Sequence, residues 1–391
     1  LIVLKEDGSF RLNMEYFGYM DSLLMTNEKF HNLFEGPPRE PESIITRKEM
    51  NLAASIQVVL EEIVIGLAAY AKKETEMDNL VLAGGVALNC VANGKLQKEG
   101  IFDNLWIQPA SGDAGGALGA ALLISHMYFD IPRKIREDKR DTQKGSYLGI
   151  QYSSSEVKAY LDRNDYPYEC IPDRSDLYSM VADTISEGKI IGYMSGRMEF
   201  GPRSLGARSI LGDPRNIKTQ SIMNLKIKYR ESFRPFAPSV LFEDVGDYFE
   251  MENESPYMLL VAPVKKNRQI ISKINNKNED NMLKIINEPR SDIPAVTHVD
   301  YSARVQTVHP EDNADYYNII KAFKEKTGCS LVVNTSFNVR GEPIVCSPDD
   351  AYKCFMRTEM DMLVMEDCIL HKENQPEFND NVDWKDEYEL D

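Results

Sequence analysis

Several common signatures of function are absent from the sequence. It contains no Walker A loop and no Gly-x-Ser-x-Gly elbow, and its five histidines form neither a His-x-x-x-His nor a His-Glu-x-x-His pair. These absences argue against a P-loop nucleotide site, a serine-hydrolase triad and a histidine-based zinc protease site. There is also no solenoid-type repeat and no low-complexity tract. The composition is that of an ordinary globular protein.

Paired cysteines and long apolar runs are also lacking. The six cysteines are scattered and include no Cys-x-x-Cys pair. This spacing favours a reducing cytoplasm over a disulfide framework or a zinc site. The most apolar stretch, 58–71, is interrupted by Glu61 and Glu62, which makes it too amphipathic to span a membrane. We therefore expect a cytoplasmic protein with no membrane partner.

Positive charge is scarce overall and concentrated in one stretch. The 391 residues carry a formal net charge of −17, which argues against non-specific nucleic-acid binding. Residues 196–235, called the basic island below, nevertheless hold six arginines and three lysines against three acidic residues. Glycines and prolines interleave with these arginines and predict loops rather than one helix. Arginines on loops suit phosphate or carboxylate, and the alternative is a set of surface salt bridges.

The length allows two domains. Residues 130–146 are polar and almost free of apolar side chains, which predicts a linker and a boundary near 145. The expected domains are therefore 1–145 and 146–391. The chain begins at Leu1, inside what reads as a β-hairpin over residues 1–13. We expect it to be a fragment of a longer protein.

The first domain shows a capped helix followed by two strand–glycine loop–helix units. Thr46 and Glu49 form a capping-box pattern before an apolar stripe that predicts a core helix. A buried strand over Asn79–Ala83 then leads through Gly84 and Gly85 into a helix at 86–96, near whose start Asn89 lies. A second strand at 105–109 leads through a small-residue loop into a helix at 117–128. Such units offer backbone N–H groups to phosphate or sugar oxygens.

Asp113 is the only charged residue in the second of these loops. A carboxylate at this position is either a helix N-cap or a metal ligand. The local sequence leaves both interpretations open.

The second domain is predicted to alternate strands and helices. The expected strands are 147–150, 189–194, 294–308, 331–345 and 362–365, and the expected helices are 155–162, 177–187, 220–228, 312–327 and 348–356. The strand 189–194 leads into the basic island, and ligands in α/β proteins usually lie at such strand ends. The strand 294–308 carries four polar residues, including His298 and Arg304, that face either a cleft or solvent. The loop after 331 offers Asn334, Ser336 and Asn338 to an anionic ligand.

Five segments together resemble one enzyme family. They occur in family order and together are highly specific: Leu82–Asn89, Ser111–Ala117, Glu199–Leu211, Phe233–Pro238 and Asn334–Asn338. The chain resembles the O-carbamoyltransferases, which include the nodulation-factor, cephamycin and aminoglycoside carbamoyltransferases. The resemblance extends from about residue 80 to residue 365.

This resemblance implies an α/β protein of two units. The first would be part of the actin-like ATPase fold of the tRNA threonylcarbamoyl-transfer proteins (Kae1-like), and the second would have the threonylcarbamoyl-adenylate synthase fold (YrdC-like). Such enzymes use carbamoyl phosphate and ATP to make a carbamoyl-adenylate, and pass the carbamoyl group to a hydroxyl of a sugar or antibiotic. The implied partners are carbamoyl phosphate, ATP and a hydroxylated small molecule, with no nucleic acid and with a homodimer as a possible assembly.

The resemblance also assigns roles to residues. The catalytic contacts would come from Arg203, Arg208 and Arg234. Further substrate or nucleotide contacts would come from Gly84, Gly85, Asn89, Arg197, Arg230, His298, Arg304, Asn334, Ser336 and Asn338. Asp113 would be one ligand of a divalent, iron-type metal. The family carries its metal-binding His-x-x-x-His pair in a half-domain that this sequence lacks, so we expect this chain to bind no stoichiometric metal and not to complete acceptor transfer.

Two other functions stay open at this point. The chain could be a threonylcarbamoyl-type tRNA-modification factor, although its acidic balance and the fusion of both domains argue against a tRNA substrate. It could also be a non-catalytic regulatory module in which Arg203 and Arg208 bind a nucleotide as effector.

Overall fold

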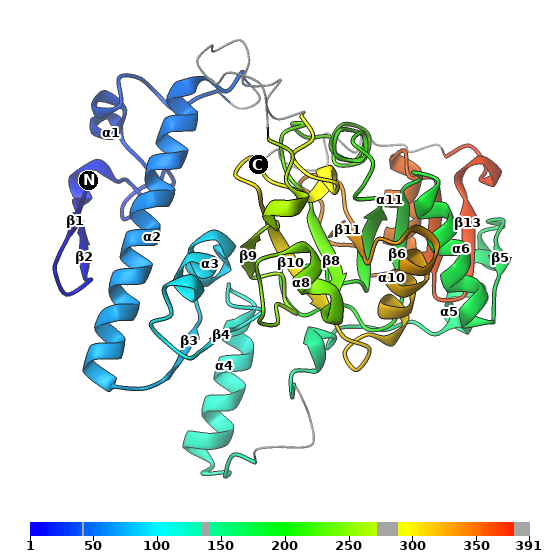
Figure 1. Cartoon of the computed structure of the whole chain (residues 1–391), viewed down its shortest axis with the longest axis horizontal. Coiled ribbons are helices and arrows are strands. Elements are labelled where there is room, and N and C mark those ends of the chain that lie inside the picture. Colours follow the sequence, from blue (N-terminus) through cyan, green and yellow to red (C-terminus); the bar gives the residue numbers. More distant parts are fainter. Residues whose placement is uncertain (41–42, 135–140, 272–287, 379–391) are drawn as a thin grey trace. The chain divides into compact units, whose positions relative to one another are not determined.

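The computed structural model describes residues 1–40, 43–134, 141–271 and 288–378 (Figure 1). Within these ranges the chain separates into two compact units. The first comprises Leu1–Leu82 and Val91–Trp106, and the second comprises Ala83–Cys90 and Ile107–Asp391. A compact unit need not coincide with a domain, so the boundary near residue 145 stays a prediction.

The first unit begins with the predicted hairpin, which the structure confirms. β1 (Ile2–Leu4) pairs antiparallel with β2 (Phe10–Leu12). After α1 (Glu28–Leu33), the helix α2 (Arg47–Thr75) runs for 29 residues. Its predicted capping box is also confirmed, because the Glu49 carboxylate accepts from the Thr46 N–H at 2.8 Å while the Thr46 hydroxyl oxygen accepts from the first turn of the helix.

The helix α2 departs from its predicted place in a core. Within its apolar stripe only Ile63 is buried, whereas Ile56 and Leu67 are 57% and 42% exposed. The first unit has few elements to cover so long a helix. The expectation that the stretch 58–71 is too amphipathic to span a membrane is wrong by length and composition, since α2 is long and apolar enough to cross one. This is a weak indication, because core helices and signal sequences share these properties. The absence of a membrane partner therefore stays a prediction.

A two-stranded sheet of β3 (Asn79–Leu82) and β4 (Asn104–Ile107) completes the first unit. Both strands are predicted correctly, but the expected burial of the first is wrong. Its residues alternate between exposed and half-buried positions, as expected when a sheet has only two strands and an open face. The helix predicted at 86–96 begins later, as α3 (Cys90–Glu99), because a 3₁₀ turn over Gly85–Leu88 precedes it.

The second unit is built on a nine-stranded sheet. Its strands, in spatial order, are β5 (Glu169–Cys170), β13 (Cys368–His371), β12 (Met362–Met365), β6 (Ile191–Met194), β7 (Arg208–Gly212), β11 (Leu331–Ser336), β8 (Ala237–Leu241), β10 (Ser302–Val308) and β9 (Leu260–Pro263). The pairs β6–β12 and β8–β10 are parallel, and the other pairs are antiparallel. This mixed sheet with its helices confirms the predicted α/β class.

The helices of the second unit largely follow the sequence predictions. They are α4 (Gly115–Leu123), α5 (Ser154–Arg163), α6 (Arg174–Ser186), α7 (Thr219–Ile222), α8 (Val245–Tyr248), α10 (Ala314–Thr327) and α11 (Pro348–Arg357). π-helical turns extend α4 through Ile124–Tyr128 and α7 through Met223–Ile227. The predicted helices at 117–128, 155–162, 177–187, 220–228, 312–327 and 348–356 are therefore confirmed.

Three strand predictions need correction. The strand expected over 331–345 is β11, which ends at Ser336. Residues 147–150 form no strand, since Tyr147 makes only an isolated bridge to Glu199. The strand expected over 294–308 begins only at Ser302, because a 3₁₀ turn over Pro294–Val296 and a tight turn at Tyr301 come first. The predicted linker at 130–146 includes residues 135–140, which lie outside the described part of the chain.

Both faces of the sheet are covered near its centre. In β6, the ring of Tyr193 lies 6.5 Å from that of Tyr316 in α10. A Cβ at the neighbouring Gly192 would approach the Phe337 ring to 2.7 Å, so this side of the strand needs glycine. Because successive residues of a strand point to opposite faces, these two contacts show that β6 is packed on both sides. The basic island begins where this buried strand ends.

Candidate functional site

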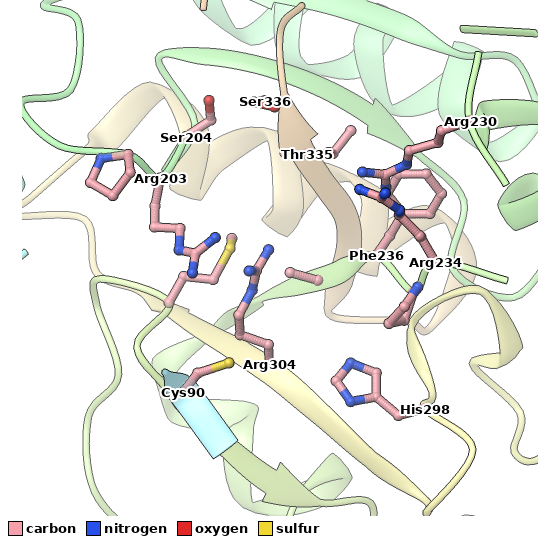
Figure 2. Close-up of a pocket in the computed structure, with 14 residues that line it drawn as sticks. Cys90, Arg203, Ser204, Arg230, Arg234, Phe236, His298, Arg304, Thr335 and Ser336 are labelled. Atoms are coloured by element: carbon pink, nitrogen blue, oxygen red, sulfur yellow. The ribbon is translucent and has the colours of Figure 1, made fainter. Parts of the chain in front are cut away.

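A cavity of about 360 Å³ opens in the second unit beside the basic island (Figure 2). Its lining is Cys90, Pro202, Arg203, Ser204, Arg230, Arg234, Pro235, Phe236, Ala237, Met258, His298, Arg304, Thr335 and Ser336. None of these residues is acidic, and four are arginines. An enclosure with several arginines and no carboxylate in its lining suits a ligand with more than one negative charge.

The sheet order explains how distant segments meet at this cavity. β11 lies between β7 and β8, so Thr335 and Ser336 at its end stand between the segments that flank those two strands. Arg203 and Ser204 precede β7, and Arg234 and Phe236 precede β8. Arg304 comes from β10, on the other side of β8. The cavity therefore forms where strand ends and their connections converge, as is usual in α/β proteins.

Arg203 and Arg304 point into the cavity from neighbouring walls (Figure 2). Arg203 Nη2 donates to the Leu88 carbonyl oxygen at 3.3 Å. Burial lowers the pKa of Arg304 to about 10, and the positive charge of Arg203 contributes in the same direction. Two partly desolvated guanidinium groups that repel each other would gain from an anion placed between them.

Arg230 and Arg234 form a second cationic pair in the cavity. Arg230 Nε donates to Asn224 Oδ1 at 2.7 Å, and its guanidinium lies 5.1 Å from the centre of the Phe236 ring. Burial lowers the pKa of Arg230 to about 10, with a further contribution from Arg234. Arg234 itself pairs with Glu231 at 3.2 Å. Among the described residues, Arg230 thus forms no ion pair with a carboxylate.

His298 lines the cavity as a neutral side chain. Its Nδ1 lies 3.1 Å from Ser302 Oγ. Burial lowers the pKa of His298 to about 4. The positive charges of Arg304 and Arg290 also lower this pKa, whereas the negative charge of Asp300 raises it. At neutral pH the imidazole therefore offers a hydrogen bond rather than a charge. Of the four polar residues predicted to share a face, His298 and Arg304 meet in the cavity.

Lys228 is a polar residue beside the cavity that the sequence did not single out. Its side chain is buried, and its Nζ donates to Ser336 Oγ at 3.1 Å and to Asn338 Oδ1 at 2.7 Å. It also donates to the carbonyl oxygens of both residues. Burial lowers its pKa to about 7, with Arg230 contributing. Its place in the basic island, two residues before Arg230, was a weak signal, since nothing in the sequence shows that this lysine is buried.

Several predicted site residues lie outside the cavity. Arg208 is fully buried and donates to the carbonyl oxygens of Gly196, Ala207 and Ile150 at 3.2, 2.9 and 3.3 Å. Burial lowers its pKa, while Glu199 and Glu366 oppose that change. Arg197 is exposed and donates to the Gly149 carbonyl oxygen at 3.0 Å. The cavity lining thus includes neither arginine, and their proposed substrate contacts stay untested predictions.

Of the site residues predicted in the Asn334–Asn338 loop, some line the cavity and others lie outside its lining. Ser336 lines the cavity, whereas Asn338 binds Lys228 behind it. Asn334 is fully buried, and its Nδ2 donates to Ser204 O, Ser239 Oγ and Gln306 Oε1. Its contacts therefore hold the wall in place rather than reach into the cavity.

The glycine loops are not part of the lining either. Gly84 and Gly85 are exposed, and a Cβ at either would meet no atom within 4 Å. Gly84 has a φ of 98°, which favours glycine at this turn. Asn89 is half-buried beside the lining residue Cys90. A ligand contact from these three residues stays a prediction.

Asp113 does not complete a metal site in the described structure. Its side chain is exposed, and α4 begins at an Ala114 cap with no side-chain hydrogen bond, so the N-cap alternative is not realised there. Among the described residues no group of three or more His, Cys, Asp or Glu side chains is placed to hold a metal. The residues present do not fit the metal that the resemblance implies, and no step below depends on it.

Comparisons with known proteins identify the family. A model described as carbamoyltransferase N-terminus matches residues 1–122, and one described as carbamoyltransferase C-terminus matches residues 182–372. The chain belongs to the carbamoyltransferase family. The predicted family resemblance is thereby confirmed.

Three relatives show how far the similarity extends. An uncharacterised protein of Synechocystis is 55% identical over all of this chain and 63% of its own length. Nodulation protein NolO of Bradyrhizobium diazoefficiens is 37% identical over 94% of this chain and 61% of its own length. The 3'-hydroxymethylcephem-O-carbamoyltransferase of Amycolatopsis lactamdurans is 29% identical over 81% of this chain and 53% of its own length. The carbamoyltransferase chain thus spans less than two thirds of each of these relatives.

Proposed function

We propose that this protein takes part in the ATP- and carbamoyl-phosphate-dependent transfer of a carbamoyl group to a hydroxyl of a sugar- or antibiotic-like small molecule. The transfer would proceed through a carbamoyl-adenylate. The observation that carries the proposal is the cavity with four arginines and no acidic residue in its described lining. Membership of the carbamoyltransferase family supports the type of group transferred.

The size and charge of the cavity fit this substrate class. Its volume of about 360 Å³ lies within the range of roughly 300–1,000 Å³ that is usual for small-molecule sites. Carbamoyl phosphate and the ATP phosphates both carry several negative charges. Because the four guanidinium groups are partly desolvated, they attract phosphate oxygens more strongly than exposed arginines would.

The chemistry divides between the two arginine pairs. Arg203 and Arg304 would hold one phosphate group, and Arg230 and Arg234 a second. Water would first displace phosphate from the carbamoyl carbon and give carbamate. A carbamate oxygen would then attack the α-phosphorus of ATP, so that the adenylate forms as the bond to pyrophosphate breaks. Preorganised cations at these positions would stabilise the negative charge that develops on the leaving groups. The neutral His298 and the Ser336 hydroxyl would add hydrogen bonds to the bound groups. In the second step the acceptor hydroxyl oxygen attacks the carbamoyl carbon, and AMP leaves with the electron pair.

The finer assignments form part of the same proposal. Residues 1–145 would be part of an actin-like ATPase fold, and residues 146–391 would have the threonylcarbamoyl-adenylate synthase fold. One relative is named for transfer to the hydroxymethyl group of a cephem, and a comparable hydroxylated small molecule is the acceptor that we propose here. The formal charge of −17 favours such an acceptor over a nucleic acid.

The release of pyrophosphate tests the proposal. Purified protein should release pyrophosphate from ATP only when carbamoyl phosphate is present. Arg304→Gln should reduce this release by about tenfold or more, since a hydrogen bond to a charged group contributes roughly 1.5–3 kcal/mol. Lys218→Gln removes one positive charge at an exposed position of the basic island, outside the cavity lining, and should leave the rate unchanged.

Two results would contradict the proposal. Binding of ATP without carbamoyl-phosphate-dependent pyrophosphate release would instead indicate a nucleotide-binding regulatory module. A requirement for tRNA in the reaction would indicate the tRNA-modification alternative.

A further inference from the structure

Two cysteines that lie 198 positions apart in the sequence face each other across two strands. Cys170 on β5 is the direct partner of Cys368 on β13 in an antiparallel pair. The two residues are the cross-strand neighbours at one edge of the nine-stranded sheet. Because directly opposed side chains lie on the same face of a sheet, their thiols are on one side of the strands.

The hydrogen-bond register brings these two residues especially close. The Ile171 N–H donates to the Asp367 carbonyl oxygen at 2.8 Å, so this flanking pair is the hydrogen-bonded one. Cys170 and Cys368 therefore occupy the non-hydrogen-bonded position, where Cα atoms are typically about 4.5 Å apart. A disulfide needs a Cα separation of about 4.4–6.8 Å. The backbone can thus accept a bond between the two sulfurs with little movement.

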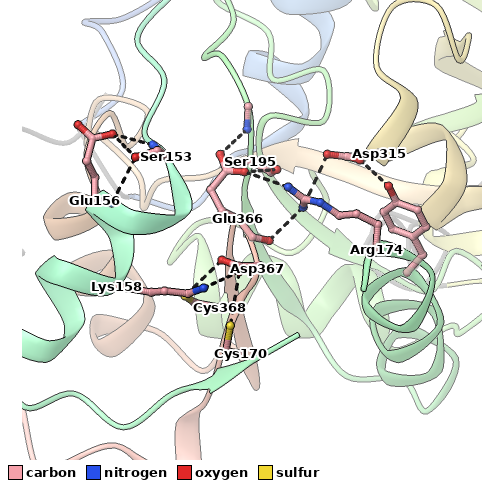
Figure 3. A network of polar contacts seen from close by, with 12 residues as sticks. Ser153, Glu156, Lys158, Cys170, Arg174, Ser195, Asp315, Glu366, Asp367 and Cys368 are labelled. Carbon is pink, nitrogen blue, oxygen red and sulfur yellow. Dashed lines mark hydrogen bonds and ion pairs between the residues drawn. The ribbon is translucent and has the colours of Figure 1, made fainter. Parts of the chain in front are cut away.

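The two thiols lie near the same carboxylate but differ in their exposure to solvent (Figure 3). Cys170 Sγ lies 3.4 Å from Asp367 Oδ2, and Cys368 Sγ lies 3.7 Å from Asp367 Oδ1, so both approach the same carboxylate. Lys158 Nζ pairs with that carboxylate at 2.7 Å. Cys170 is exposed, whereas Cys368 is buried. An oxidant in solution can reach the first thiol, and the second is positioned to react only with its neighbour.

We propose that Cys170 and Cys368 form a reversible dithiol–disulfide site that reacts with low-molecular-weight disulfides such as oxidised glutathione. The Cys170 thiolate attacks one sulfur of the reagent and forms a mixed disulfide, while one glutathione leaves as a thiol. Cys368 then loses its proton and attacks the Cys170 sulfur, which releases the second glutathione as a thiol. Two protein thiols are oxidised to one disulfide, and one reagent disulfide is reduced to two thiols.

The sequence allows this bond to be detected directly. Cleavage after Lys and Arg places Cys170 in the peptide 164–174 and Cys368 in the peptide 358–372, and each peptide contains one cysteine. The whole chain is reduced, treated with oxidised glutathione, alkylated under denaturing conditions and digested. Mass spectrometry should show the two peptides joined with the loss of two hydrogens. Addition of excess dithiothreitol should separate them again.

A matched pair of variants decides the assignment. Cys346 is also exposed, so Cys346→Ser removes a thiol of similar accessibility and should leave the joined peptides at the wild-type amount. Cys170→Ser should abolish them, with Cys368 recovered in alkylated form. A glutathione adduct that persists on Cys170, or recovery of both cysteines in alkylated form from the wild-type chain, would overturn the proposal. So would a bond from Cys170 to any other cysteine.

Discussion

The buried ammonium of Lys228 donates to Asn338 Oδ1 at 2.7 Å. This contact joins the helical turn before Arg230 to the loop that follows β11. The same Nζ reaches Ser336 Oγ at 3.1 Å, and Ser336 lines the arginine cavity. Lys228 therefore holds one wall of the cavity from behind, and the position of that wall depends on a titratable group.

Replacing Lys228 should loosen this wall and weaken ligand binding. In Lys228→Met the carbonyl oxygens of Ser336 and Asn338 lose the Lys228 donor, while Asn338 Oδ1 keeps only the Ser336 hydroxyl at 2.7 Å. An unsatisfied buried polar group costs about 1–3 kcal/mol. We expect the affinity for carbamoyl phosphate, measured by calorimetry, to fall about fivefold or more. The control is Lys226→Met, since Lys226 is exposed and pairs with Glu359 at 2.5 Å on the surface. Equal losses in both variants would show that the wall does not depend on Lys228.

The stability of the chain should also depend on pH through Lys228. Its pKa falls from 10.5 to about 7 on folding, so between these values the unfolded chain holds a proton that the folded chain lacks. The free energy of unfolding therefore gains a contribution that rises with pH across this window, by several kcal/mol at most, at about 1.4 kcal/mol for each pKa unit. Below pH 7 both states hold the proton, and the cost of burying the charge is present in full.

Urea unfolding of the wild type and of Lys228→Met across this pH window measures the effect. As the pH rises, the free energy of unfolding of the wild type should increase relative to that of Lys228→Met. Other groups that titrate in this range cancel in the difference. A constant difference would mean that Lys228 keeps its proton in the folded chain.

Anion binding should draw a proton onto His298. The pKa of this residue is lowered to about 4 by burial and by Arg304 and Arg290. A bound anion offsets those charges, so the pKa of His298 should rise. Sulfate is a suitable probe because, unlike phosphate, it does not itself titrate near neutral pH. At a pH between about 4 and the pKa of Lys228, about 7, calorimetry in buffers of different ionisation enthalpy should report uptake of a fraction of a proton.

The variant His298→Gln provides the control for this measurement. It keeps a hydrogen-bonding side chain but cannot take up the proton. Sulfate should still bind, with a heat that no longer depends on the buffer. Proton uptake that persists in this variant would assign it to another group, and buffer-independent heat in the wild type would contradict the prediction.

The sequence predicts the local elements of this fold better than their surroundings. Helix caps such as Thr46 and buried strands such as β6 are determined by residues close to them in the sequence, so a local pattern predicts them. The burial of α2 and β3 depends on which elements pack against them, and no local sequence pattern specifies those elements. The strand expected at 147–150 fails for a related reason, because Tyr147 finds only one bridging residue, Glu199.

The candidate site shows the same limit at the level of side chains. The sequence identified the basic island as a group, and Arg203, Arg230 and Arg234 do line the cavity. It could not separate them from Arg208, because the direction of each side chain depends on the pairing of β7 with β6 and β11. Lys228 was not singled out for the same reason, since its burial arises only when the loop after β11 packs over it.

Arg208 should therefore matter for stability more than for ligand binding. Its buried guanidinium donates to three backbone carbonyl oxygens, and the nearby Glu199 carboxylate accepts from the backbone N–H groups of Leu205 and Ala207 at 2.7 and 2.8 Å. Breaking a buried charged network of this kind typically costs about 3–5 kcal/mol. We expect Arg208→Met to lower the free energy of unfolding, measured in urea, by about this amount.

An exposed arginine provides the control that distinguishes a loss of stability from a loss of ligand binding. Arg197→Met removes an exposed arginine from the same basic island and should change the free energy of unfolding by less than about 0.5 kcal/mol. Under conditions where Arg208→Met stays folded, its sulfate affinity should remain close to that of the wild type, because its side chain lies outside the cavity lining. A large loss of sulfate affinity with unchanged stability would reverse this assignment and return Arg208 to the ligand-binding residues.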